Sequence, residues 1–469
     1  MTNKNEEFDL TIIGAGSAAF AAAIKATELG ATVAMVESGI IGGTCLNIGC
    51  APSKALLRAA EHYHRSGHSP FAGVSTFSGT VDFRAMVAAK DDLVAAMRHD
   101  RYEDLLEVYG IQVIRGEARF TAPDRVEVDG RGAGGSRFLI ATGAEPWSPP
   151  IPGLDGVAYL ASTTALELSE VPAELTVVGA NAIGLELGQL FLHLGTRVTF
   201  VEALERIAPF EEPEISAELT RHLESLGARV ISSATITSAS QTGEKRLLEI
   251  EVGDESLQVE SDQLLMATGR RARTANLGLF EAGVDTDTRG HVTTDRRMAT
   301  SNPLVFAAGD VTTLPQFVYV AALSGNIAAQ HALRGTGRTI DLTTMPRVTF
   351  TTPAIASVGI TEAEARERGK SPLVSVVPLE IVPRALVDQD TTGLIKLVAD
   401  SRDGRLLGAH ILAENAGEVI QAAVMAIKYR ANVDDIADTF HPYLTMAEGL
   451  KLAAQGFSKD VKHLSCCAA

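Results

Sequence analysis

Short apolar runs alternate with helix-favouring stretches in the first part of the chain. Residues 8–13 (FDLTII) combine apolar and β-branched side chains, which is typical of a buried strand. A glycine-containing turn follows, then an alanine-rich run to about residue 29, and then a second apolar run over 32–36. This order predicts a strand, a helix and another strand, which is the repeating unit of an α/β fold with a parallel sheet.

The turn of this unit carries a pattern that binds dinucleotides. Residues 14–19 read GAGSAA, and Glu37 lies 23 residues after Gly14, at the end of the next strand. In such a Rossmann unit the glycines let the backbone approach a pyrophosphate at a helix N-terminus, and the acid accepts hydrogen bonds from a ribose. The candidate contacts are Gly14, Gly16, Ser17, Ala18 and Glu37.

The same unit recurs further along the chain. A strand, the turn GANAIG over 179–184, a helix and a strand over 197–201 lead to Glu202, again 23 residues after the first glycine of the turn. Asn181 replaces the middle glycine, and we expect the turn to survive because Asn tolerates positive φ better than most residues. Two such units predict two nucleotides, and the natural pair is a flavin and a nicotinamide that exchange a hydride.

Composition narrows the class of protein. The 469 residues suggest three domains at about 150 residues each. A net charge of −17 repels phosphate backbones, so no nucleic acid partner is expected. The N-terminus lacks a signal pattern, and no run of 18 uncharged apolar residues occurs, so we expect a cytoplasmic protein without a membrane span. The cysteines form two tight pairs, Cys45 with Cys50 and Cys466 with Cys467, which indicates chemistry rather than a disulfide scaffold.

The first cysteine pair lies between the two nucleotide units, in the segment GGTCLNIGCAPSK over 42–54. Five residues of regular helix rise about 7.5 Å, which exceeds the Cα separation of roughly 4.4–6.8 Å found in disulfides. A disulfide between Cys45 and Cys50 therefore requires an irregular backbone, which Asn47, Gly49 and Pro52 can supply. Glycines at a helix start also favour a lowered thiol pKa. We expect a redox-active pair rather than two inert thiols.

This segment resembles the active site of the flavin-dependent pyridine nucleotide–disulfide oxidoreductases. The resemblance extends over the whole chain, because 141–143 (ATG), 267–270 (ATGR) and 305–310 (VFAAGD) match further motifs of the family. It implies FAD beside Cys50, an outer thiol at Cys45 that meets substrate, and Asp310 on the flavin ribityl chain. Lys54 and Glu186 would form an ion pair near the flavin ring. Further cofactor contacts are implied at Gly43, Thr44, Cys45, Lys54, Gly116, Ala118, Thr142, Gly143, Gly179, Gly184, Glu202, Gly269, Arg270 and Gly309.

The resemblance also implies the domain organisation. We expect an α/β protein with two Rossmann-like domains and a C-terminal α+β dimerisation domain. The FAD domain would comprise 1–149 and 269–338, the NAD(P) domain 150–268, and the dimerisation domain 339–469. The active sites would lie at the interface of a homodimer.

The C-terminal part departs from the disulfide reductases of this family at their general base. Those enzymes carry His-Pro-x-x-x-Glu, and alignment on Glu448 places Tyr443 at the histidine position, with His441 two residues earlier. A tyrosine pKa is near 10, so it is a poor base at neutral pH. Tyr443 is either a packing aromatic or a functional group. The mercuric reductases of this family are similar here and at Tyr159, and both tyrosines are expected to approach the metal in them.

The chain ends in the second cysteine pair. Adjacent Cα atoms are about 3.8 Å apart, too close for an ordinary disulfide, so Cys466 and Cys467 suit metal exchange as soft thiols. The segment from residue 443 onward resembles the mercuric reductase C-terminus. The resemblance implies that this tail collects Hg(II) and passes it to Cys45 and Cys50 of the dimer partner, where electrons from NAD(P)H through FAD reduce it to Hg(0).

Alternatives stay open at the sequence level. His441 could act as the base of a dihydrolipoamide-dehydrogenase-like disulfide reductase, and Asn181 could mark a mercury-binding thiol protein without hydride transfer. Glu202 favours NADH because a carboxylate repels a 2′-phosphate, whereas the family resemblance favours NADPH and Arg206 lies nearby. His62, His64 and His68 are expected on a solvated helix surface.

Overall fold

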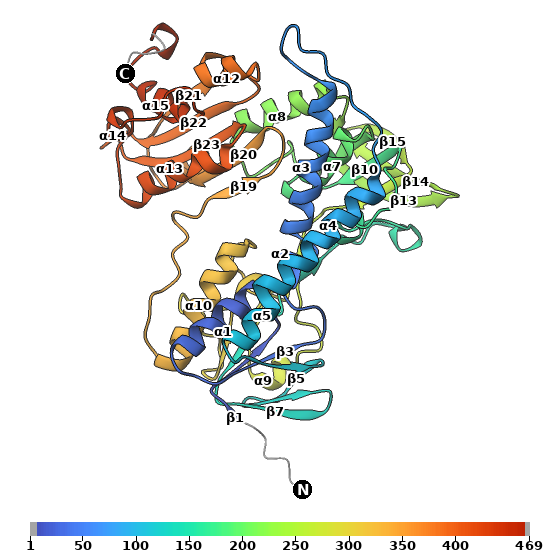
Figure 1. The fold of residues 1–469 in the computed structure, drawn as a ribbon, viewed down its shortest axis with the longest axis vertical. Helices are drawn as coiled ribbons and strands as arrows, with labels where there is room; N and C mark the ends of the chain where they lie inside the picture. Colours follow the sequence, from blue (N-terminus) through green and yellow to red (C-terminus); the bar gives the residue numbers. More distant parts are fainter. Residues whose placement is uncertain (1–6, 465–469) are drawn as a thin grey trace. The chain divides into compact units, whose positions relative to one another are not determined.

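The chain forms two compact units, drawn in Figure 1. The computed structural model describes residues 7–464, and Cys466 and Cys467 lie outside them. Of the described residues, the first unit contains 7–55, 84–148 and 269–341, and the second contains 56–83, 149–268 and 342–464. Within the described range, none of the helices combines the length and apolar character needed to span a bilayer.

A five-stranded parallel sheet forms the centre of the first unit, with strand order β18-β8-β2-β3-β4. Strand β2 is buried at every position, as expected for a parallel sheet covered on both faces. The predicted strand, helix and strand are confirmed as β2, α1 and β3. The strands of the sheet are β2 (Leu10–Ile13), β3 (Val33–Glu37), β4 (Gln112–Arg115), β8 (Phe138–Ile140) and β18 (Val305–Ala307). Helix α1 (Ser17–Glu28) packs against helix α10 (Val318–Arg334).

Smaller elements complete the first unit. A four-stranded sheet has the order β1-β7-β6-β5, and β9 pairs antiparallel with β17. The strands are β1 (Glu7–Phe8), β5 (Ala118–Ala122), β6 (Arg125–Val128), β7 (Arg131–Gly135), β9 (Ala144–Pro146) and β17 (Arg270–Ala272). The helices are α2 (Gly43–Asn47), α4 (Phe83–Arg98), the π-helix η1 (His99–Glu103), α5 (Asp104–Val108), α9 (Leu279–Ala282) and η3 (Gly309–Val311). Helix α3 (Cys50–Gly67) begins in this unit and continues into the second.

The second nucleotide unit of the sequence forms a parallel sheet with order β12-β11-β10-β16. An antiparallel sheet, β13-β14-β15, lies in the same part of the chain. The strands are β10 (Glu174–Val178), β11 (Arg197–Val201), β12 (Arg229–Ile231), β13 (Ala234–Thr242), β14 (Lys245–Val252), β15 (Glu255–Ser261) and β16 (Gln263–Met266). The helices are η2 (Leu154–Gly156), α6 (Ser162–Ala165), α7 (Ala182–His193) and α8 (Pro213–Ser225). The predicted repeat is therefore confirmed.

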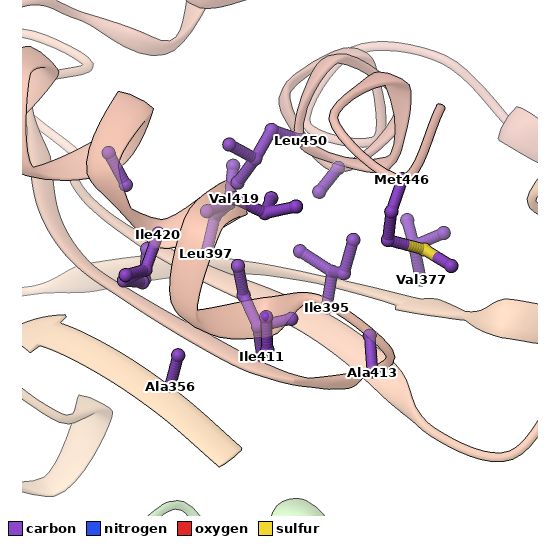
Figure 2. Close-up of a cluster of buried hydrophobic side chains, with 14 of the residues drawn as sticks. Ala356, Val377, Ile395, Leu397, Ile411, Ala413, Val419, Ile420, Met446 and Leu450 are labelled. Carbon is purple, nitrogen blue, oxygen red and sulfur yellow. The ribbon is translucent and has the colours of Figure 1, made fainter. Parts of the chain in front are cut away.

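The C-terminal part is an antiparallel sheet with order β19-β20-β23-β22-β21, covered by α13 and α15. Figure 2 shows its core, in which Ile395 and Ile411 of the sheet cluster with Val419 and Leu450 of the helices. The strands are β19 (Arg347–Thr349), β20 (Ala354–Gly359), β21 (Pro372–Pro378), β22 (Leu394–Asp400) and β23 (Leu406–Ala413). The helices are α11 (Glu362–Glu367), η4 (Leu379–Ile381), α12 (Pro383–Asp388), α13 (Ala416–Lys428), α14 (Val433–Asp438), α15 (Glu448–Gln455) and η5 (Val461–His463).

This α+β part belongs to the same compact unit as residues 149–268. One reason is a buried cation, because Lys396 on β22 is only 1% exposed. Its Nζ lies 2.9 Å from Glu212, 2.8 Å from Glu214 and 2.9 Å from Glu362. The first turn of α8 is thus joined to the C-terminal sheet by ion pairs. The predicted boundaries between the three domains stay predictions.

Three histidine rings stack in the second unit. His64 lies parallel to His68, with ring centroids 4.2 Å apart, and to His193 of α7 at 4.5 Å. The expectation of a solvated surface is therefore wrong for His64, which packs on a buried ring. Burial, followed by the nearby His64, His222 and Arg65, lowers the pKa of His193 to about 3.

This lowered pKa makes stability depend on pH. An unfolded histidine has a pKa of about 6.5, so between that value and the folded pKa the unfolded state binds more protons. The contribution of neutral His193 is fully present above about pH 6.5 and decreases as the pH falls toward 3. We expect His193→Phe to reduce the loss of unfolding free energy between pH 6.5 and 5, measured by urea denaturation. The exposed His62, changed in the same way, is the control, and equal pH slopes in all three proteins would contradict this assignment.

Candidate active site

The first fingerprint turn is a place where two stretches of main chain touch. Gly14 follows β2 with φ +109°, and a Cβ on it would lie 2.4 Å from the carbonyl oxygen of Ala141. The turn over 141–143 therefore packs directly on the fingerprint. A Cβ on Gly43 would lie 2.5 Å from the Cα of Gly16, so the start of the redox segment also packs on this turn. Only glycine permits either approach.

The N-terminus of α1 fits the pyrophosphate of FAD. Helix α1 has no acid in its first turn, and its N-cap, Gly16, has no side chain to satisfy the first N–H groups. These donors, at Ser17 and Ala18, are the kind that bind phosphate oxygens. Glu37 accepts the Gly39 N–H through one carboxylate oxygen, at 2.7 Å. Its second oxygen suits a ribose hydroxyl.

The other FAD candidates also belong to the first unit. Burial raises the pKa of Asp310, and the nearby Arg270 opposes that shift. The N–H of Gly309 donates to Ser324 Oγ at 3.0 Å, and Thr142 Oγ1 donates to the Arg273 carbonyl at 2.7 Å. Gly116 and Ala118 lie where β4 passes into β5, and Gly143, Gly269 and Gly309 have φ of +73°, +122° and +75°.

The redox segment is irregular, as predicted. Helix α2 ends at Asn47, Ile48 has φ −141°, and α3 begins anew at Cys50. A Cβ on Gly49 would lie 2.8 Å from the carbonyl oxygen of Thr44, so glycine is required at this bend. Cys45 is partly buried, Cys50 is exposed, and both are thiols in this structure.

The two thiols are hydrogen-bonded to each other. This bond, followed by burial, raises the pKa of Cys45, and the charge of Lys54 opposes the shift only weakly. The expected lowering of the pKa is therefore wrong for Cys45 in the dithiol form. The glycines and helix start indicated a thiolate, but a second sulfur within hydrogen-bonding distance keeps a proton between the two groups.

Tyr102 is a residue near this pair that the sequence did not single out. It lies on the π-helix η1, and its ring packs edge-on against Phe20 of α1, with centroids 4.8 Å apart. Burial raises its pKa, a hydrogen bond with Ser17 lowers it, and Cys45 and Cys50 raise it. Short π-helical turns next to α-helices often occur at functional sites, but no sequence pattern marks them.

The second fingerprint repeats the first one. Gly179 has φ +94°, and a Cβ on it would lie 2.6 Å from the carbonyl oxygen of Ala267. A Cβ on Gly184 would lie 1.9 Å from the carbonyl oxygen of Gly179. Asn181, however, has φ −105°, close to the −93° of Gly16, so the expected positive φ is wrong. The middle position is extended in both turns, and Asn181 causes no backbone strain. This turn fits a nicotinamide dinucleotide.

The acid of the second unit is held by main-chain donors. Glu202 is buried, and its carboxylate accepts the N–H groups of Ala180 at 2.7 Å and Leu204 at 3.0 Å. The guanidinium of Arg206 donates to the carbonyl oxygens of Pro209 at 3.0 Å and Glu211 at 3.3 Å. The two main-chain hydrogen bonds thus fix the position of the Glu202 carboxylate.

The remaining candidates are in the second unit. Glu186 is buried and accepts the Phe350 N–H at 2.9 Å, whereas Lys54 belongs to the first unit, so their ion pair stays a prediction. Tyr159 and Tyr443 are 41% and 53% exposed, and their approach to a metal also stays a prediction. Burial raises the pKa of Glu448, backbone groups of Leu444 and Arg384 oppose that shift, and its Oε1 is buried without a hydrogen-bond partner among the described residues. His441 is exposed, and its Nδ1 lies 3.0 Å from the Thr439 carbonyl oxygen.

The close approach at Gly14 gives a test of the fingerprint turn as the FAD-binding turn. A Cβ 2.4 Å from the Ala141 carbonyl oxygen would push the two stretches of backbone apart, and a loss of about 1.4 kcal/mol is a factor of ten in binding. We expect Gly14→Ala to reduce FAD retention by about tenfold or more, measured by flavin absorbance after gel filtration. Gly30→Ala is the matched control, because Gly30 also has positive φ (+79°) but nothing lies within 4 Å of its Cβ position. Equal FAD loss in both variants would contradict the close-approach argument.

Comparison with known proteins places this geometry in a family. The pyridine nucleotide-disulphide oxidoreductase model matches residues 8–325, and the dimerisation-domain model of the same group matches 345–454. Mercuric reductase from Staphylococcus aureus is 50% identical over 99% of the chain and 85% of its own length. Mercuric reductase from Streptomyces lividans is 48% identical over the full length of both proteins.

Similar folds occur among solved structures. The HOCl-induced flavoprotein disulfide reductase RclA from Escherichia coli, as its Cu(II) complex, has a TM-score of 0.86 and 29% identity, covering 96% of this chain and 99% of that one. LpdA from Mycobacterium tuberculosis has a TM-score of 0.85 and 28% identity, with 95% and 98% covered. The α/β fold predicted with two dinucleotide units and a dimerisation domain is confirmed. The chain belongs to the pyridine nucleotide-disulphide oxidoreductase family, in its mercuric reductase branch.

Proposed function

We propose that this protein is a mercuric reductase, which reduces Hg(II) to Hg(0) with electrons from NAD(P)H. The observation that carries the proposal is the 50% identity to a mercuric reductase over 99% of the chain, together with the segment of the thiol pair, whose start at Gly43 packs on the first fingerprint. The reaction balances as NAD(P)H plus Hg(II) giving NAD(P)⁺, H⁺ and Hg(0). FAD, when bound, supplies a two-electron relay between nicotinamide and metal.

Cys45 and Cys50 hold the metal in this proposal. Hg(II) is a soft ion and binds sulfur as thiolate, so each cysteine releases its proton as the metal binds. The hydrogen bond that raises the pKa of Cys45 in the dithiol form is replaced by two bonds to the metal. After reduction, Hg(0) carries no charge and leaves the sulfurs.

The dimer and the C-terminal cysteine pair supply the remaining parts of the proposed route of Hg(II) to Cys45 and Cys50. The match to the dimerisation domain supports a homodimer whose active sites lie at the subunit interface. Tyr159 and Tyr443 are exposed enough to approach the metal there. Cys466 and Cys467 would collect Hg(II) from thiol complexes and exchange it stepwise to the inner pair. We expect this reaction in the cytoplasm, where NAD(P)H and reduced thiols occur.

We propose NADPH as the physiological reductant. Glu202 is buried and already accepts main-chain N–H groups from Ala180 and Leu204, one on each oxygen, which leaves less of its carboxylate to bind a ribose diol. Arg206 adds a cation four residues further on. The resemblance to mercuric reductases supports the same choice.

Capture of volatile mercury tests the reaction. We expect anaerobic NADPH oxidation by Hg(II) in excess thiol, with trapped Hg(0) equal to NADPH consumed and a lower kcat/KM for NADH. The Cys50→Ala variant is the control, because it removes one of the two thiolates. No Hg(0) above this control would refute the proposal. Rapid dihydrolipoamide oxidation would instead support the disulfide reductase with His441 as base.

The tail is tested separately. Replacing Cys466 and Cys467 by Ala removes the outer thiols but leaves the inner pair intact. We expect turnover to fall with Hg(II) bound to a bulky thiol such as glutathione and to change little with a small ligand such as cyanide. Steady-state NADPH oxidation measures both. Unchanged turnover with the glutathione complex would exclude the relay.

A further inference from the structure

Asn47 uses its whole side-chain amide to fix the redox segment. It lies between Cys45 and Cys50, and its Nδ2 donates to the carbonyl oxygens of Ile41 at 2.9 Å and Gly43 at 3.0 Å. Its Oδ1 accepts a hydrogen bond from Arg98 Nη1 at 2.9 Å. Both N–H donors and the acceptor of this amide are therefore engaged.

The segment that Asn47 holds has little regular structure of its own. Helix α2 has five residues, and its N-cap Gly42 and first residue Gly43 have φ of +103° and +64°. A helix of one turn is not stable in isolation, because nucleation costs more than one turn of hydrogen bonds returns. The backbone between Cys45 and Cys50 therefore depends on contacts from outside the segment.

Arg98 is such a contact, and it is itself anchored. It is the last residue of α4, and its Nε lies 3.7 Å from the carboxylate of Glu103 in the following π-helix. The same π-helix holds Tyr102 against Phe20 of α1. The junction of α4 and η1 thus joins the redox segment to the helix whose N-terminus faces the cofactor.

We propose that Arg98 is a positioning residue for the cysteine pair and that it acts through Asn47. The inference rests on the proposed function in one respect, that Cys45 and Cys50 form a redox pair. A disulfide requires the two Cα atoms within roughly 4.4–6.8 Å. With the bond between Arg98 and Asn47 in place, the segment keeps the two sulfurs together. Without it, the segment also occupies conformations in which they are apart, so the disulfide is less favoured over the dithiol.

Thiol–disulfide equilibrium measures this effect directly. In glutathione buffer the Cys45–Cys50 disulfide plus two glutathione thiols give two protein thiols plus glutathione disulfide, with two electrons transferred. The FAD-loaded enzyme is equilibrated without oxygen over a range of glutathione ratios, alkylated, and the peptide 42–54 is quantified by mass spectrometry. We expect Arg98→Ala to shift the equilibrium toward the dithiol by about tenfold, which is about 30 mV for this couple. Arg98→Lys, which keeps a charged donor, should restore part of the shift.

Two comparisons separate positioning from general damage. Arg101→Ala removes the same charge from an exposed position on the same segment and should leave the equilibrium unchanged. Asn47→Ala should shift it in the same direction as Arg98→Ala, and adding Arg98→Ala to Asn47→Ala should change little more, because the two residues act through one bond. Flavin content and melting temperature check folding, and Arg98→Lys serves if Arg98→Ala does not fold.

An Arg98→Ala equilibrium within twofold of the parent, a full shift in Arg101→Ala, or additive effects of Arg98→Ala and Asn47→Ala would each overturn the proposal. No mercury enters this measurement. A protein that fails to release Hg(0) but shows the coupled shift would refute the proposed function and leave the positioning role in place. A protein that releases Hg(0) without the shift would refute the positioning role alone.

Discussion

Contact between main chain and main chain at the first glycine of each fingerprint is the constraint on which the rest of this structure depends. Gly14 packs on the Ala141 carbonyl and Gly179 on the Ala267 carbonyl, at distances that leave no room for a side chain. Each contact brings an A-T-G turn beside the N-terminus of a helix, where phosphate-binding N–H groups are exposed. In the first unit, Gly43 adds a third stretch of backbone at the same point. The close approach of these glycines therefore positions the start of the redox segment through its backbone, without any side-chain contact of the cysteines.

Most of the fold follows from local sequence, and the failures have specific causes. Apolar runs followed by glycine turns predicted β2, α1 and β3 because strand and helix signals there agree with the tertiary structure. Asn181 was expected to need positive φ, but that conformation belongs to Gly179, and a motif alone does not say which of its glycines bears it. The pKa of Cys45 depends on a second sulfur. Arg98 ends an ordinary amphipathic helix and Tyr102 lies in the π-helix that follows it, and only tertiary contacts give them a role.

The C-terminal departure from the disulfide reductases also has a structural account. Glu448 keeps a buried position, but in place of a histidine its carboxyl meets the backbone of Leu444 and Arg384. Leu444 has φ +57°, a conformation that a non-glycine residue adopts only when it is held there. The acid lies beside the bend next to Tyr443, and its Oε1 is buried without a hydrogen-bond partner among the described residues.

The buried Lys396 limits which parts of this chain can be exchanged with the corresponding parts of related proteins. Its three carboxylate partners come from α8, beside the second fingerprint, and from the C-terminal part. A buried cation that loses its partners carries a large desolvation cost, and so does Glu212, the one buried carboxylate of the three. The nicotinamide-binding segment and the C-terminal sheet are therefore not separate modules. Recombination between relatives, in nature or in the laboratory, can replace both together, but replacing one alone introduces a mismatched buried charge.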